Sequence, residues 1–174
     1  MVKGINVRTH RLVSDGFGAA AYGTVLMLLC LMPLSVLAQI SLTSALLDRF
    51  DAMKNTAVLR NGEKLAYIDT GPHTAPPLIL IHGYTDSARD WAPIAPLLTP
   101  RFRLIIVDLR GQGGSDKPDC CYTRFDFAYD IKLLLDSLNI PTADVVGHSL
   151  GSIVAQTFAE LWPDTTRQIG RAHV

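Results

Sequence analysis

A serine between two glycines is the feature of the sequence best suited to catalysis. Residues 147–151 read Gly-His-Ser-Leu-Gly, between a short apolar run and a segment whose apolar residues recur at helical spacing. This context predicts a sharp turn from a strand into a helix, where a side chain at Gly147 or Gly151 would meet neighbouring backbone. We therefore predict that Ser149 is a nucleophile in a strained conformation, with its hydroxyl lifted clear of the sheet. The alternative, a serine that only caps the helix, explains neither glycine.

A second motif, His-Gly-Tyr at 82–84, directly follows the continuously apolar run 77–81. A turn after a buried strand can direct a backbone amide at a developing negative charge. We therefore predict that the backbone N–H groups of Tyr84 and Leu150 form an oxyanion hole with two donors.

Two histidines lie in these motifs, and we expect neither to act as the general base. His82 is predicted to support its loop together with Gly83. His148 is predicted to direct its ring away from the Ser149 hydroxyl. A general base must lie within about 3 Å of the proton that it removes, which these two positions do not favour.

A glycine-rich segment at 108–115, Asp-Leu-Arg-Gly-Gln-Gly-Gly-Ser, resembles a dinucleotide-binding fingerprint only superficially. The third glycine position of that fingerprint is occupied by Asp116, and Lys-Pro-Asp at 117–119 follows in place of a helix start. We therefore expect no nucleotide cofactor at this loop.

The apolar pattern around the motifs predicts an α/β fold. Asn61-Gly62 separates two apolar runs, which favours a hairpin with a two-residue turn in which both residues have positive φ. Continuously apolar runs then alternate with helical patterns, which is typical of a mostly parallel sheet with helices on both faces. The expected strands are 57–60, 64–69, 77–81, 102–107 and 144–147, and the expected helices are 88–98, 127–138 and 150–161.

Together, the motifs 82–84, 108–115 with Lys117-Pro118, and 147–151 resemble the α/β-hydrolase family of esterases, lipases, lactonases and cofactor-free haloperoxidases. They occur in the family's order, and the resemblance covers about residues 56–167. It implies a structural role for the loop 108–115 and neither a metal nor an organic cofactor. In the family, the triad acid and the triad histidine follow the nucleophile on later strands. Neither is present here, so we expect the sheet to be truncated after the helix that follows Ser149.

The function implied by the resemblance is hydrolysis of a small-molecule ester or related acyl bond through an acyl-enzyme at Ser149. Dehalogenases and epoxide hydrolases of this fold are disfavoured because they need a carboxylate nucleophile. Cofactor-free haloperoxidases or perhydrolases, C–C hydrolases and a non-catalytic binding protein stay open as alternatives. Because the triad is incomplete, the 174-residue chain itself is expected to be inactive and to fold poorly.

The composition is that of a globular protein: 48% of the residues are hydrophobic, and 16 basic side chains balance 16 acidic ones. Without net charge or a basic run, nucleic acid is not an expected partner.

The basic start at 1–17 and the uncharged, apolar stretch that follows predict a signal peptide over 1–38 and an exported protein, periplasmic or secreted. An uncleaved membrane anchor over 18–37 is the alternative, and only then is a membrane an expected partner. Residues 39–55 are expected to form a lead-in segment.

The last residues, 168–174, match the translation of a widely used sequencing adapter, and we expect them to be an artefact rather than a natural tail. His173 is therefore excluded from any catalytic role.

Of the three cysteines, Cys30 would leave with the signal peptide. Cys120 and Cys121 are adjacent, with α-carbons about 3.8 Å apart, which is shorter than a disulfide normally spans. Either one of them pairs with a cysteine elsewhere, or both are unpaired thiols.

Overall fold

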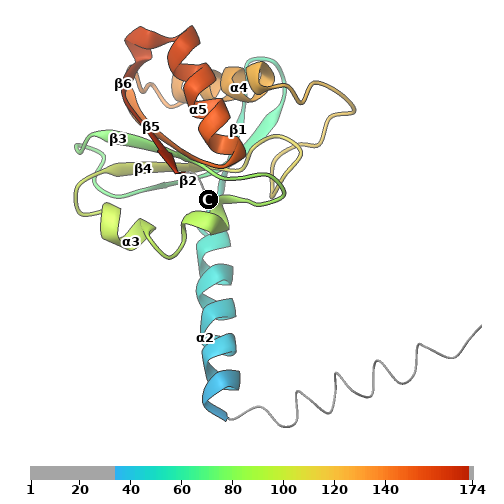
Figure 1. Ribbon diagram of the computed structural model, residues 1–174, viewed down its shortest axis with the longest axis vertical. Coiled ribbons are helices and arrows are strands. Elements are labelled where there is room, and N and C mark those ends of the chain that lie inside the picture. The colour runs from blue at the N-terminus through green and yellow to red at the C-terminus, as the bar shows by residue number, and fades with distance from the viewer. Residues whose placement is uncertain (1–33, 173–174) are drawn as a thin grey trace, which may run out of the picture. The chain divides into compact units, whose positions relative to one another are not determined.

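Residues 34–172 are described by the structure, a computed structural model (Figure 1). The chain divides into two compact units, Met1–Leu42 and Thr43–Val174, and the second contains the sheet and the candidate site. Helix α2 (Leu34–Asp51) begins in the first unit and ends in the second. Most of the predicted export segment lies outside the described residues. Within them, no helix is both long and apolar enough to cross a membrane.

Six strands form one sheet in the order β1-β2-β4-β3-β5-β6. The bounds are β1 (Asn55–Val58), β2 (Lys64–Thr70), β3 (Pro77–Ile81), β4 (Arg103–Val107), β5 (Ala143–His148) and β6 (Thr166–Ala172). Strand β2 is antiparallel to both β1 and β4, whereas β4, β3, β5 and β6 run parallel to one another. The predicted α/β class with a mostly parallel sheet is confirmed.

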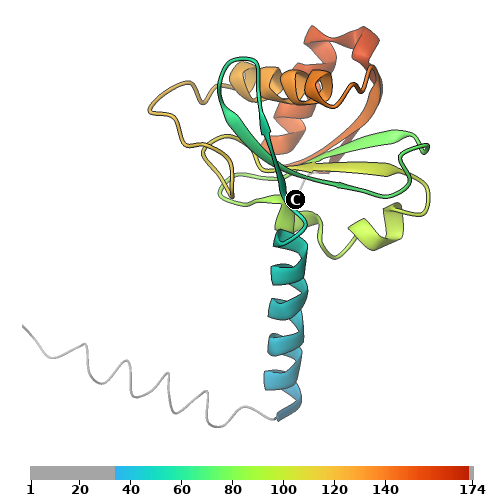
Figure 2. The same ribbon diagram turned by 180° about the vertical axis from the view of Figure 1, so that it is seen from behind.

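Both faces of the central strands are covered, which explains why β3 and β4 are apolar without alternation. On one face, Ile79 and Ile105 pack in a cluster with α4 (Arg124–Ser137) and α5 (Leu150–Leu161). On the other, Leu80 and Ile106 pack with the 3₁₀ helix η1 (Ala88–Trp91) and with α3 (Ala95–Leu98). Figures 1 and 2 show α4 and α5 on one side of the sheet and α3 on the other. The parallel strands therefore end at one common edge, where the predicted motifs follow them.

The sequence explains where α4 begins and where α5 ends. A capping box opens α4, in which the Thr123 side chain accepts from the Asp126 N–H and the Asp126 carboxylate accepts from the Thr123 N–H. Helix α5 buries Val154 and Phe158 completely and ends at Leu161. A 3₁₀ turn, η2 (Pro163–Thr165), follows, because proline cannot continue the helix.

The hairpin forms as predicted, but its turn is longer than two residues. The pairing of β1 and β2 stops at Val58 and Lys64, and Leu59 N–H donates to the Glu63 carbonyl over 2.8 Å. Of the two predicted turn residues, only Gly62 has a positive φ, of 90°. Leu59 is 3% exposed and belongs to the core, so the chain turns inward before it can reach the predicted register.

The predicted helix over 88–98 is two short pieces, η1 and α3, rather than one helix. Pro93 lies in the break and lacks the N–H that would continue the helical hydrogen bonding after η1, whereas Pro96 lies in the first turn of α3, where a missing N–H is tolerated. The short pieces still bury Ala88, Trp91 and Ala95 against the sheet.

The prediction that the sheet ends at the nucleophile strand is wrong, because β6 pairs in parallel with β5. The register joins Ala143 to Thr166 and Val145 to Ile169, and Arg167 donates to the Asp144 carboxylate over 2.7 and 3.2 Å. After the crossover through α5, the next extended segment can satisfy the otherwise unpaired backbone edge of β5. Strand β6 includes residues expected to derive from an adapter, and that origin stays a prediction.

Candidate active site

The turn between β5 and α5 has the strained geometry that the sequence predicts. Ser149 has φ of 51° and ψ of −116°, a left-handed region that side chains rarely adopt, and it is exposed. A Cβ atom on Gly147 would lie 2.0 Å from the Gly151 carbonyl oxygen. A Cβ atom on Gly151 would lie 2.2 Å from the carbonyl oxygen of Ile81 in β3. Both glycines are therefore required by close backbone contacts, as predicted.

Ser149 occupies the N-cap position of α5, but its hydroxyl makes no capping hydrogen bond. A simple capping role for this serine is therefore excluded. The structural hydroxyl is instead that of Ser152, which donates to the Gly147 carbonyl over 2.8 Å in a buried position. Its backbone N–H also donates to the Ser149 carbonyl over 2.9 Å. Sequence analysis did not identify Ser152, although a serine in the first turn of a helix can bond back to the preceding backbone.

The loop after β3 lies directly against the turn that carries Ser149. A Cβ atom on Gly83 would be 3.4 Å from Ser149 Cβ and 3.3 Å from His148 Nδ1. The next residue, Tyr84, is 74% exposed. Tyr84 and Leu150 both line one cavity of about 660 Å³. The two residues predicted to supply the oxyanion N–H groups are thus brought to the same cavity, beside Ser149.

His82 is completely buried beneath this loop, and both of its ring nitrogens have partners. Nδ1 lies 2.7 Å from the Gly83 carbonyl, and Nε2 accepts from the Leu109 N–H over 3.0 Å. A neutral ring that donates from Nδ1 satisfies both contacts. Burial lowers the pKa of His82, which favours that neutral form, and the hydrogen bond to Gly83 opposes this shift only in part. These two contacts are consistent with the predicted supporting role of His82.

His148 makes a contact with an acidic side chain rather than with the serine hydroxyl. Its Nδ1 lies 3.4 Å from Oδ2 of Asp90, and the same oxygen accepts from the Gly83 N–H over 3.4 Å. Asp90 also shares a hydrogen bond with Asp86, and the pKa of Asp86 is raised by burial and by this bond. Asp90 therefore links the loop of Gly83 to the His148 ring, a contact that sequence analysis did not anticipate.

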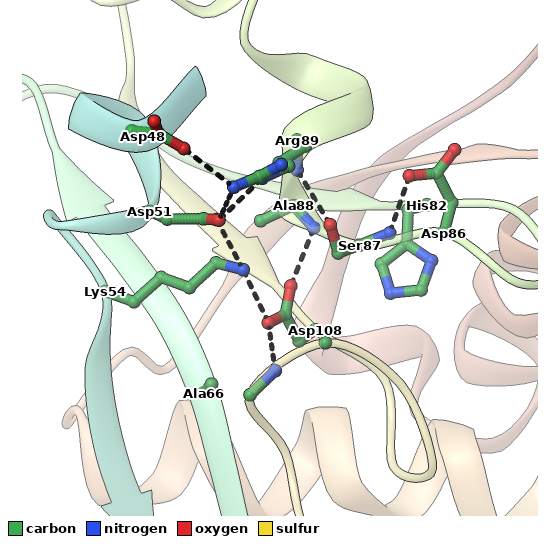
Figure 3. A network of polar contacts seen from close by, with 12 residues as sticks. Asp48, Asp51, Lys54, Ala66, His82, Asp86, Ser87, Ala88, Arg89 and Asp108 are labelled. Atoms are coloured by element: carbon green, nitrogen blue, oxygen red, sulfur yellow. Dashed lines mark hydrogen bonds and ion pairs between the residues drawn. The ribbon is translucent and has the colours of Figure 1, made fainter. Parts of the chain in front are cut away.

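The glycine-rich loop after β4 is organised around one buried carboxylate, that of Asp108. Asp108 accepts from the Ala88 N–H over 2.6 Å, from the Gly114 N–H over 2.8 Å and from Lys54 Nζ over 2.7 Å (Figure 3). A Cβ atom on Gly113 would lie 2.1 Å from Oδ2 of Asp108, so the loop can fold over the carboxylate only with glycine there. The structural role expected for the loop 108–115 is confirmed.

Arg110, in the same loop, lines the cavity but is already paired. It donates two hydrogen bonds of 2.6 Å to Asp130, which is 1% exposed, and these bonds raise the pKa of Arg110. Tyr122 and Phe127 form an aromatic part of the same wall. Because the guanidinium is neutralised by its partner, the wall offers a substrate mainly apolar surface.

The adjacent cysteines beside this wall form a disulfide. Cys120 and Cys121 are joined across a Cα separation of 3.8 Å, so the expectation of a partner elsewhere or of two unpaired thiols is wrong. The backbone of Cys121 has φ of 72°, and its carbonyl accepts from Arg110 Nη1 over 2.9 Å. The carbonyl contact connects the disulfide to Arg110 in the loop after β4.

Comparison with known proteins places these motifs in one family. A family model described as alpha/beta hydrolase fold matches residues 76–166. The soluble epoxide hydrolase of Corynebacterium sp. (strain C12) is 35% identical over 99 residues, which cover 57% of this chain and 34% of that protein. The 2-(acetamidomethylene)succinate hydrolase of Mesorhizobium japonicum is 38% identical over 96 residues, which cover 55% of this chain and 34% of that protein.

Solved structures agree with the sequence matches. The enol-lactonase from Burkholderia xenovorans LB400 has a TM-score of 0.64 at 29% identity, over 66% of this chain and 45% of that one. The chain thus spans only part of the length of the relatives that it matches. The region matched by the family model contains both the loop 82–84 and the turn 147–151. The chain belongs to the α/β hydrolase fold family.

Proposed function

We propose that the protein is a serine hydrolase that cleaves an ester or a related acyl bond through an acyl-enzyme at Ser149. The observation that carries the proposal is the backbone of Ser149, strained and exposed between two glycines that tolerate no side chain. Strain of this kind is kept where it serves a function, and it presents the hydroxyl at the N-terminus of a helix. A serine that only supported the fold would not need it.

In the proposed reaction, the Ser149 oxygen attacks the acyl carbon, and the carbonyl oxygen becomes negatively charged. The backbone N–H groups of Tyr84 and Leu150 stabilise that charge, and each such donor is worth about 10²–10³ in rate. The alcohol or other leaving group departs with a proton, and water then releases the acid from Ser149. The resemblance implies that a histidine paired with an acid, both outside the motifs of this chain, moves the protons.

The relatives have hydrolase names that differ in the bond cleaved, so they support hydrolysis more strongly than any one substrate. The residue type at position 149 limits which of these bonds the protein can cleave. Serine is an alcohol nucleophile and gives an acyl-enzyme, whereas epoxide opening and dehalogenation in this fold need a carboxylate there. Ester and lactone cleavage therefore fit Ser149 better than epoxide cleavage.

The proposal is tested with p-nitrophenyl esters and the full-length protein that carries this chain. We expect a burst of about one equivalent of p-nitrophenol, and a loss of about 10⁴-fold or more in kcat for Ser149→Ala with the fold intact. Ser137→Ala, at an exposed position on α4, is the matched control and should behave as wild type. A Ser149→Ala protein that keeps more than about a tenth of the activity would overturn the proposal.

A further inference from the structure

The support of the oxyanion loop depends on one buried negative charge. The Asp108 side chain is fully buried, and it accepts hydrogen bonds from three separate segments: the lead-in at Lys54, the start of η1 at Ala88 and the glycine loop at Gly114. Within residues 34–172, Lys54 is the only cation that contacts this carboxylate. A buried carboxylate without a charged partner is strongly disfavoured, so this ion pair offsets part of the free-energy cost of burying Asp108.

The side chain of Lys54 is mostly buried and contacts two carboxylates. Its side chain is 15% exposed, and its ammonium also contacts Asp51 over 2.8 Å. Burial alone would lower the pKa of Lys54, but the hydrogen bonds to Asp108 and Asp51 raise it above its ordinary value. Asp51 in turn accepts from Arg89 in η1 over 2.5 Å, so the lead-in contacts η1 by two routes (Figure 3).

The Ala88 N–H, which donates to Asp108, lies four residues beyond Tyr84, where the loop 82–87 leads into η1. At its other end, this loop is fixed by His82, and in the middle Gly83 lies against Ser149. Loss of the Ala88 contact would weaken the attachment at the far end of this loop, where the Asp86 N–H also donates to Gln112 over 3.2 Å. A displacement of about 1 Å in a positioned catalytic group can cost about 10²-fold in rate.

We propose that Lys54 is a positioning residue of the active site, which acts through Asp108 and the Ala88 N–H to place the Tyr84 amide beside Ser149. The lead-in segment that contains Lys54 is then part of the catalytic unit, not a spacer that precedes it. The catalytic part of this inference rests on the proposed function. The coupling of Lys54 to the loop does not, and it can be measured separately.

The test compares Lys54→Met with Arg103→Met in the full-length protein. Arg103 forms an ion pair of similar burial with Asp69, with side chains 14% and 13% exposed, but it lies at the start of β4 while Asp108 follows its end. Both variants lose an ion pair, so both should lose stability. Only Lys54→Met should lower kcat, by about 10²-fold, with KM changed by less than about threefold, because the loop acts on the transition state. Lys54→Arg, which keeps the charge, should recover most of that loss.

Hydrogen exchange of the peptide around residues 83–88 gives a readout that needs no catalysis. It should be faster in Lys54→Met and unchanged in Arg103→Met. Unchanged exchange, or a kcat equal to that of Arg103→Met, would overturn the positioning role. If Lys54→Met does not fold, Lys54→Gln gives the same comparison, with a smaller expected effect. Failure of the proposed function would look different: exchange would still respond to Lys54, while the wild type would form no acyl-enzyme.

Discussion

Replacing Gly151 with alanine tests whether the close contact between α5 and β3 keeps Leu150 and Ser149 in place. In an ordinary helix this change would stabilise the protein by about 0.5–1 kcal/mol, because alanine is the better helix former. Here the new Cβ would lie 2.2 Å from the Ile81 carbonyl oxygen and 2.7 Å from that of His82, and backbone atoms cannot rotate away.

The clash therefore decides whether Gly151→Ala raises or lowers the free energy of unfolding. Overpacking typically costs about 1–3 kcal/mol, and a contact this short belongs at the upper end, so we expect a net loss of about 2 kcal/mol in the free energy of unfolding. Relief of the clash would move the start of α5 by about 1 Å, which should lower the acylation rate by about 10²-fold. Both quantities can be measured, by urea unfolding and by the rate of covalent labelling of Ser149.

Gly62→Ala is the matched control. Gly62 has φ of 90° but no atom within 4 Å of its Cβ position, so alanine there introduces backbone strain without a clash. We expect about 1 kcal/mol of destabilisation from strain alone and an unchanged labelling rate. If Gly151→Ala proved as stable as wild type and labelled at the same rate, the close packing of α5 on β3 would not be what positions the serine.

Two further predictions concern the loop after β3. Tyr84→Phe should leave kcat within about threefold of wild type, whereas Tyr84→Pro, which removes the N–H, should lower it by about 10²-fold or more, and equal damage from both would implicate the phenol instead. His82 should make stability depend on pH: its folded-state pKa is lowered, so its contribution is complete above the unfolded value of about 6.5 and is lost as pH falls from there towards the folded value. The free energy of unfolding of His82→Gln should therefore fall less steeply with acid than that of the wild type, and parallel curves would contradict the buried neutral imidazole.

Much of the fold could be predicted because its signals are local. The continuous apolar runs predicted strands β3 and β4, and the spacing of Val154 and Phe158 predicted the buried face of α5. The length of the hairpin turn was predicted wrongly because a tertiary contact overrides local preference there. The burial of Leu59 sets the length of the hairpin turn.

The residues of the candidate site likewise fall into two groups, those that local motifs predict and those that depend on partners far away in the sequence. The positions of Ser149, Tyr84 and His82 follow from motifs in which a glycine or a strand end fixes the geometry. Lys54 and Asp90 could not be identified, because their importance comes from partners 54 and 58 residues away, Asp108 and His148 (108 − 54 and 148 − 90). A lysine before a strand or an aspartate in a short 3₁₀ helix has no sequence signal that reveals such a partner.

The central claim is that Ser149 is the nucleophile, and covalent labelling tests it most directly. The full-length protein is treated with a fluorophosphonate, digested and analysed by mass spectrometry. We predict one adduct per molecule, on the peptide that contains Ser149, and no adduct in Ser149→Ala, while Ser137→Ala labels as the wild type does. Ester turnover by a protein that carries no adduct at Ser149, or an adduct at another serine that persists in Ser149→Ala, would contradict the assignment.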